Sequence, residues 1–229
     1  KGNSNPNTAG ISGTNAWPDA AGSYWTFRDI VSENMSFANF QANISTGTNS
    51  ANFYQQLIVE YFRGFGYDVE GEFLYVGDTD KADGTYSMME DVIIRHCAGF
   101  DKGRDGAQFN SIRNLLAEYI TVHQMGVENV SGQNLHLQAQ NVNGIIRKSI
   151  FDKAPAPANI FAHGLTIEDC YFRWDGNNPI FIGDLLSSAY GSNAETGNNL
   201  PLTFRRCTFD PSVNVTALCD WRERESNLV

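Results

Sequence analysis

The loop of this chain best suited to hold a metal ion is residues 77–84, GDTDKADG. Asp78, Asp80 and Asp83 place three carboxylates within six residues, and Gly84 permits a tight turn. Carboxylate oxygens are ligands that Ca²⁺ prefers. The spacing departs from an EF-hand loop, because Met89 stands where the bidentate Glu would be. The segment therefore predicts either a Ca²⁺ site or a solvated acidic turn.

A second group of polar and aromatic residues occurs in four short apolar segments, AQFN, LHLQ, IFAH and IFIG. If their aliphatic residues face a core, period-two alternation turns the others outward in two columns. The first column is Gln108, His136, Phe161 and Phe181, and the second is Asn110, Gln138, His163 and Gly183. Amides that bind hydroxyls and rings that stack on pyranose faces would suit a sugar site, and Arg104 and Asp105 add a charged pair at its edge. Alternatively, an outward face is polar in any case, and Phe161 and Phe181 lie under a loop of residues 187–200.

A third group is basic. Arginine recurs at one position of a repeated strand, with Thr121 and Glu168 interrupting the series, at Arg28, Arg95, Arg147 and Arg205. Such a column could complement the carboxylates of an acidic polymer. The alternative is a solvated strand face on which each arginine pairs with a nearby Asp or Glu.

These side chains are positioned by a repeat. VIIRHCAG, GIIRKSIF, LTIEDCYF and LTFRRCTF share one order of apolar, polar and small residues. The copies have no sustained 3.6-residue period and no hairpin turn signals, which favours parallel stacking in an all-β solenoid. Aligned on the small residue, they predict an inward column of Ile30, Tyr61, Cys97, His123, Ser149, Cys170 and Cys207.

Stacking places equivalent residues about 4.8 Å apart, so a column tolerates only side chains that pack against copies of themselves. Cys97, Cys170 and Cys207 are therefore predicted to be buried, unpaired thiols. Catalytic or redox use of these thiols is the alternative, and spacing alone does not test a pairing of Cys219 with Cys207. Two residues further on, a second inward column is predicted at Met125, Phe151, Phe172 and Phe209.

Composition limits the classes of function. The chain has 229 residues, 41% of them hydrophobic, which is enough for a sizeable core. A net charge of -10 argues against nucleic acid as a partner. No run approaches the 18 or so apolar residues of a membrane span, and the start at Lys1 is compatible with a processed, exported chain.

The IIRKSIF-type strands, the opening YWTFRDI and the corner GRDGAQ resemble the pectate-lyase-like superfamily over roughly residues 24–215. The resemblance implies a single-stranded right-handed parallel β-helix of about seven coils with loop insertions. It also implies an extracellular or cell-surface location, a polysaccharide partner and a groove along one face. Related lyases use Lys or Arg to remove the proton α to a uronate carboxylate, which makes Lys148 a candidate base beside Arg104 and Asp105.

The resulting hypothesis has three segments: an irregular or capping lead-in at residues 1–23, the β-helix at 24–215 and a tail or cap at 216–229. The predicted function is that of a carbohydrate-active protein, a polysaccharide lyase if it is catalytic. The alternative is a non-catalytic polysaccharide-binding protein, an adhesin, a tailspike-like part or a subunit of a surface assembly with a protein partner.

Overall fold

The computed structural model describes residues 9–14, 25–35, 38–43, 54–67, 71–77, 89–100, 104–110, 112–124, 133–138, 143–160, 165–183, 202–213 and 218–222. Regular structure in these residues is entirely β-strand, and the paired strands are parallel, as in the pairs of β8, β12 and β16. The described residues contain no helix long and apolar enough to cross a membrane.

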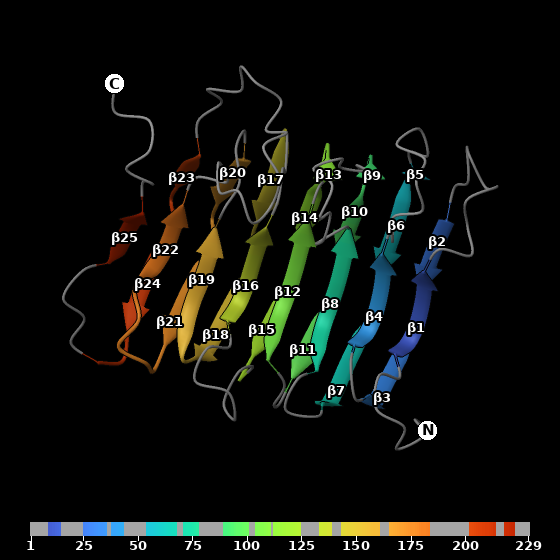
Figure 1. Ribbon diagram of the computed structural model, residues 1–229, viewed down its shortest axis with the longest axis horizontal. Coiled ribbons are helices and arrows are strands. Elements are labelled where there is room, and N and C mark those ends of the chain that lie inside the picture. The colour runs from blue at the N-terminus through green and yellow to red at the C-terminus, as the bar shows by residue number, and fades with distance from the viewer. Residues whose placement is uncertain are drawn as a thin grey trace.

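Three sheets run the length of the molecule, and a short fourth sheet lies beside them (Figure 1). Sheet A contains, in spatial order, β1 (Ala9–Thr14), β4 (Ala38–Asn43), β8 (Glu72–Gly77), β12 (Asp105–Asn110), β16 (Gln133–Gln138), β19 (Ala156–Ile160), β22 (Ile180–Gly183) and β25 (Cys219–Arg222). Sheet B contains β2 (Trp25–Arg28), β6 (Leu57–Glu60), β10 (Ile93–Arg95), β14 (Leu116–Glu118), β17 (Gly144–Arg147), β20 (Leu165–Glu168) and β23 (Thr203–Arg205). Sheet C contains β3 (Val31–Met35), β7 (Arg63–Tyr67), β11 (Ala98–Phe100), β15 (Thr121–His123), β18 (Ile150–Ala154), β21 (Tyr171–Trp174) and β24 (Thr208–Pro211). Sheet D contains β5 (Tyr54–Gln55), β9 (Met89–Glu90) and β13 (Ile112–Arg113).

The chain visits the sheets in a fixed order. It passes from sheet A to sheet B and then to sheet C before it returns to sheet A one position further along. Strands β5, β9 and β13 are inserted between sheets A and B. The predicted all-β class with parallel sheets is confirmed, and this path is consistent with a β-solenoid. Both terminal segments contribute a strand to sheet A, β1 at one end and β25 at the other.

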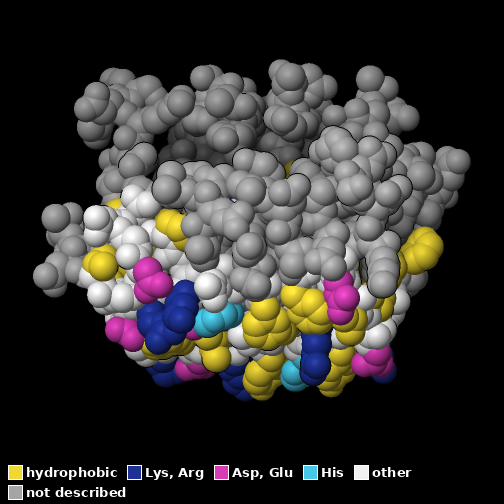
Figure 2. Space-filling model, turned by 90° about the horizontal axis from the view of Figure 1, so that it is seen from below, with side chains coloured by type: hydrophobic (Ala, Val, Ile, Leu, Met, Phe, Trp, Pro, Cys, Tyr) yellow, Lys and Arg dark blue, Asp and Glu magenta, His cyan; other side chains and the backbone are white. Residues whose placement is uncertain are grey.

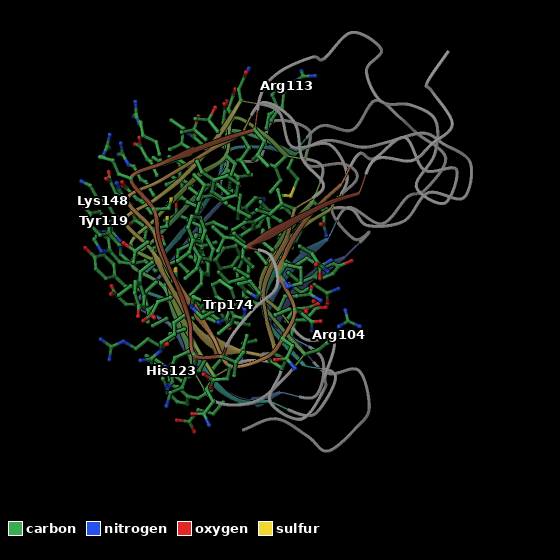
Figure 3. All side chains as sticks on the ribbon, turned by 90° about the vertical axis from the view of Figure 1, so that its left-hand side faces the viewer. Arg104, Arg113, Tyr119, His123, Lys148 and Trp174 are labelled. Atoms are coloured by element: carbon green, nitrogen blue, oxygen red, sulfur yellow. The ribbon has the colours of Figure 1, made fainter. Side chains whose placement is uncertain are left out.

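Inward side chains from the three sheets fill the interior, which Figure 3 shows along the long axis. The predicted aromatic stack is confirmed, since the rings of Phe151, Phe172 and Phe209 follow one another at centroid distances of 5.0 and 5.4 Å. The residue that precedes them in the column is Val122 instead of Met125, because Val122 pairs with Phe151. Where sheet C has Gly99, Phe73 of sheet A fills the space, and a Cβ on Gly99 would lie 2.4 Å from Phe73 Cγ.

Each passage from sheet B to sheet C turns on one non-glycine residue in the left-handed region. These seven corner residues have φ between 51° and 58°, and they are Asp29, Tyr61, His96, Tyr119, Lys148, Asp169 and Arg206. Such a φ is uncommon outside glycine. Here it lets the amide of the corner residue and the amide two residues later both donate hydrogen bonds to neighbouring strands. At one corner, the N–H of His96 donates to the carbonyl of Glu118, and the N–H of Ala98 donates to that of Phe62.

The inward column directly after this corner differs from the prediction at two positions. Tyr61 is a corner residue and Phe62 occupies the column, while His123 lies in β15 and Ile120 takes its place. The thiols and the hydroxyl have a local role, because each donates to the carbonyl two residues before it. The distances are 3.3 Å for Cys97 to Arg95, 2.9 Å for Ser149 to Arg147 and 3.2 Å for Cys170 to Glu168. Cys97 and Cys170 are buried and unpaired, as predicted, while Cys207 is unpaired and half-buried.

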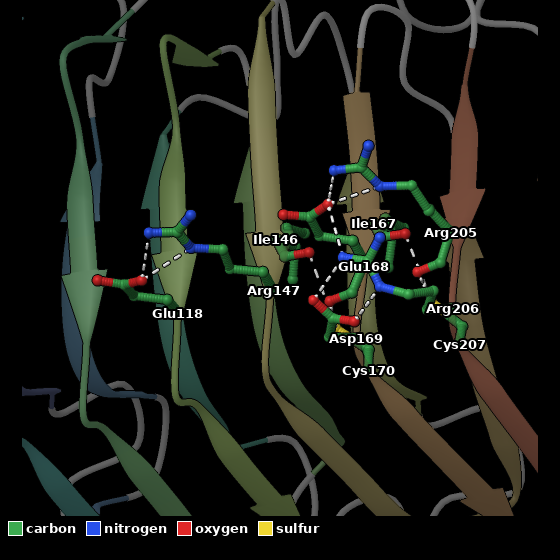
Figure 4. A network of polar contacts seen from close by, with 10 residues as sticks. All are labelled: Glu118, Ile146, Arg147, Ile167, Glu168, Asp169, Cys170, Arg205, Arg206 and Cys207. Atoms are coloured by element: carbon green, nitrogen blue, oxygen red, sulfur yellow. Dashed lines mark hydrogen bonds and ion pairs between the residues drawn. The ribbon is translucent and has the colours of Figure 1, made fainter.

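The outward column at the end of sheet B alternates strictly in charge. Its members in register are Arg28, Glu60, Arg95, Glu118, Arg147, Glu168 and Arg205. The predicted arginine series was therefore aligned wrongly at Thr121, whose place is taken by Glu118. The arginines pair with glutamates in neighbouring strands: Glu60 binds both Arg28 and Arg95, and Glu118 accepts from Arg147 at 2.8 Å (Figure 4).

Glu60 is the most enclosed acid of this ladder, at 1% exposure. The hydrogen bond from Arg28, assisted by Arg95, lowers the pKa of its carboxyl below 4.5. We expect Glu60→Gln to reduce the free energy of unfolding by about 1–2 kcal/mol, since both arginines are half exposed and become hydrated. A depressed carboxyl pKa contributes stability above the unfolded-state pKa, so the difference from wild type should fade as the pH falls below about 4.

Urea denaturation of the wild type and of Glu60→Gln at pH 7 and pH 3 measures this difference in the free energy of unfolding. Glu118→Gln is the matched control. It should reduce the free energy of unfolding less, because Glu118 binds Arg147 whereas Glu60 bridges two arginines. An equal loss for both variants at pH 7, or a Glu60 effect that persists at pH 3, would contradict the two-arginine bridge.

Candidate functional site

Arg104 and Asp105 form an ionic cluster with Glu72 at the start of two sheet A strands. The Arg104 guanidinium donates to Glu72 Oε1 at 2.6 Å and to Asp105 Oδ2 at 3.1 Å. The other carboxylate oxygen of Asp105 accepts the Gln133 amide at 3.1 Å. The two acidic side chains are 0% and 3% exposed. A pair enclosed in this way stabilises the start of the strands and leaves little freedom for proton transfer.

Lys148 lies on another side of the molecule. It is a corner residue between sheets B and C, and Figure 3 shows it across the section from Arg104. Its Nζ donates to Tyr119 Oη at 3.1 Å and stands 5.3 Å from the centroid of that ring. The structure therefore brings Arg104 and Asp105 together but does not bring Lys148 to them.

The predicted sugar columns on sheet A are in part differently aligned. Gln108 pairs with His136 and Asn110 pairs with Gln138, as expected. Strand β19 is shifted by two residues relative to the expectation, so the residue that follows His136 is Asn159 instead of Phe161, and Phe181 comes next. Gln108 is only 2% exposed, so the face is not open at this point.

Several predicted residues lie outside the described part of the chain, namely Asp78, Asp80, Asp83, Phe161 and His163. The Ca²⁺ loop thus stays a prediction. Within the described residues, no group of three or more His, Cys, Asp or Glu side chains is placed to hold a metal ion.

The outer face of sheet C carries a cluster that the sequence reasoning missed. His123 Nδ1 lies 2.7 Å from Asp152 Oδ2, and Arg173 binds Asp152 through Nε at 2.5 Å and through its terminal nitrogen at 2.9 Å. These residues come from β15, β18 and β21, which are consecutive in the sheet. Figure 2 looks onto this side, where histidine, basic, acidic and hydrophobic side chains adjoin.

Register extends this cluster into a column along the molecule. Its members are Glu33, Phe65, Phe100, His123, Asp152, Arg173 and Asp210. Phe65 and Phe100 are half-buried, so part of each ring is accessible. At the other end, Tyr171 Oη donates to Asp210 at 2.5 Å, and this bond raises the pKa of the tyrosine. We name these seven residues, together with Tyr171, the sheet C column.

The sheet C column has a defined chemistry. In the tautomer in which His123 Nδ1 donates to Asp152, the imidazole is fixed in one orientation and Nε2 is an acceptor. Asp152 is itself held by Arg173, and its hydrogen bond raises the pKa of that guanidinium. At 34% exposure, His123 can reach a bound ligand. The arrangement can orient a polar ligand, and it can accept a proton.

The enclosed Arg104 cluster predicts a strong effect of one substitution. Arg104→Met would remove a cation that both buried carboxylates bind, and we expect a loss of about 3 kcal/mol in the free energy of unfolding. Arg113→Met is the control, because its partner Glu90 is 24% exposed, and should cost less than about 1 kcal/mol. Guanidinium denaturation of both variants measures the difference, and similar losses would show that burial does not distinguish the two pairs.

Comparison of the chain with protein-family models, curated proteins and solved structures gives no match. The resemblance to the pectate-lyase-like superfamily therefore stays a prediction, and the site is interpreted from its own geometry.

Proposed function

We propose that the protein is a single-stranded right-handed parallel β-helix of about seven coils that acts outside the cell and binds a polysaccharide along the sheet C column. In the first candidate function, the protein binds the polysaccharide without catalysis. The observation that supports it is the continuous row of half-exposed rings, Phe65, Phe100 and His123, that leads into the hydrogen-bonding groups of Asp152 and Arg173.

The dimensions of the column favour an extended ligand. Neighbouring strands are about 4.8 Å apart, so seven strands present a row nearly 30 Å long. The apolar faces of sugar rings can pack on phenylalanine, and hydroxyls can bond to imidazole, carboxylate and phenol groups. A polymer that runs along the molecular axis would meet these groups one after another, whereas a small ligand would use only two or three of them.

Enzymatic elimination through the residues first considered is less well supported. Lys148 lies away from Arg104 and Asp105, and both oxygens of Asp105 accept hydrogen bonds. A scaffold role, as in an adhesin, a tailspike-like part or a surface assembly with a protein partner, is compatible with the same binding face.

Glycan-array screening followed by titration calorimetry tests the binding proposal. Phe100→Ala should weaken binding of the selected glycan roughly tenfold or more, because a ring contact contributes about 1.5 kcal/mol or more. Ile145→Ala is the matched control, because it removes an exposed apolar side chain from sheet B, and it should bind as wild type does. Unchanged affinity in Phe100→Ala, with loss in the sheet A variant Gln41→Ala, would place the ligand on sheet A and overturn the proposal.

The oriented His123–Asp152 pair supports a second candidate function, β-elimination of a uronate polymer with His123 as the base. Incubation with pectate and alginate, with and without Ca²⁺, should then increase ultraviolet absorbance from unsaturated product. His123→Gln should lower the rate at least about a hundredfold, while Lys148→Met should not change it. Absence of product from wild type on every polymer, with glycan binding retained, would reject the lyase and keep the binding function.

A further inference from the structure

Cys170 and Cys207 occupy equivalent positions in the last two corners between sheets B and C. Cys170 lies between β20 and β21, and Cys207 lies between β23 and β24. Glu168 pairs with Arg205 before them and Tyr171 pairs with Thr208 after them, so the two cysteines are in register. The Thr208 amide donates to the carbonyl of Cys170 at 2.9 Å. Residues in this relation have Cα atoms about 5 Å apart, within the range that a disulfide spans.

The two thiols also point the same way, toward the carbonyls at the end of sheet B (Figure 4). Cys170 Sγ lies 3.2 Å from the carbonyl of Glu168, and Cys207 Sγ lies 3.4 Å from that of Ile167. Cys97 has no such neighbour, because Phe62 and Ile120 stand on either side of it in the column. Proximity and common direction therefore single out one pair of thiols.

The two sulfurs differ in reactivity. A hydrogen bond from Cys170 lowers the pKa of the Cys207 thiol to about 7, while the same contact and burial raise the pKa of Cys170. Burial raises the pKa of Cys97 to about 11. Cys207 is also the accessible member, since it is half-buried at the end of the molecule while Cys170 is buried. The pair thus has an attacking thiol and a resolving thiol.

We propose that Cys170 and Cys207 are an oxidation site at which a small disulfide compound converts the two thiols into a disulfide that joins β20–β21 to β23–β24. The Cys207 thiolate attacks one sulfur of the compound, forms a mixed disulfide and releases one thiolate. Cys170 then loses its proton and attacks Cys207 Sγ, and the second half of the compound leaves as a thiolate. Two protein thiols are oxidised, one disulfide compound is reduced, and two free thiols are the products.

The location gives the bond a structural consequence. Inward residues are fully buried in the middle strands. In and beside β23 and β24, the last strands of sheets B and C, they are only partly buried, as at Leu202, Phe204, Cys207 and Phe209. These partly buried residues resist local opening less than the fully buried residues of the middle strands do. A covalent link at Cys207 would hold it to the preceding strands.

Treatment of the full chain with oxidised glutathione tests the proposal. The Cys219→Ser variant is used alongside wild type, because Cys219 is the competing partner for Cys207. After alkylation of free thiols, mass spectrometry should find the Cys170 peptide joined to the Cys207 peptide, with Cys97 alkylated only after unfolding. Hydrogen exchange at the Thr208 amide should slow roughly tenfold on oxidation and recover with reductant.

Cys170→Ser is the matched variant, because Ser149 already fills the same column and shows that serine fits there. In that variant, glutathione should stay attached to Cys207 as a mixed disulfide. Two results would overturn the proposal: a Cys207 that stays alkylatable in the folded wild type after oxidation, or a Cys207 peptide joined to that of Cys219.

Discussion

In-register hydrogen bonding between parallel strands is the constraint on which the rest of this structure depends. It places every side chain beside its equivalent in the next strand at about 4.8 Å. Like charges at that distance would repel, so the outward column of sheet B alternates between arginine and glutamate. Rings can stack at that distance, and Phe151 and Phe172 do so in the interior. Charge repulsion and ring stacking between neighbouring strands therefore limit which residues each column can contain.

The same constraint separates columns that can bind a ligand from columns that cannot. At the B–C corner the rings of Tyr61, His96 and Tyr119 stack at 4.9 and 4.8 Å and are nearly parallel. The faces between these rings are covered, and Lys148 Nζ lies over the ring of Tyr119. A sugar could therefore reach few of the ring faces there. The sheet C column places two half-buried phenylalanine rings beside a histidine that is 34% exposed, so a partner can still contact these groups.

The repeat predicted the parallel all-β class and the burial of Cys97 and Cys170 correctly, because apolar alternation and small corner residues are local signals. Register was harder to predict. The turns of the chain through sheets A, B and C differ in length. Alignment on similar residues therefore placed Tyr61 and His123 in a column to which Phe62 and Ile120 belong. The alignment recognised Glu168 but missed Glu60 and Glu118 of the charge ladder, because alternating opposite charges do not appear as a repeated residue. The His123, Asp152 and Arg173 cluster was missed for the same reason, since those residues meet only once the strands are in register.

The charge ladder also bears on how the ends of the molecule meet other copies. Strands β2 and β23 are the edge strands of sheet B, and the ladder ends in Arg28 at one edge and Arg205 at the other. A second copy stacked in register would place these two arginines together, and in sheet C it would place Glu33 against Asp210. At the corner between these sheets it would place Asp29 beside Arg206, an attractive pair, and both are exposed. Within the described ends of sheets B and C, two repulsive contacts against one attractive contact oppose end-to-end stacking of copies.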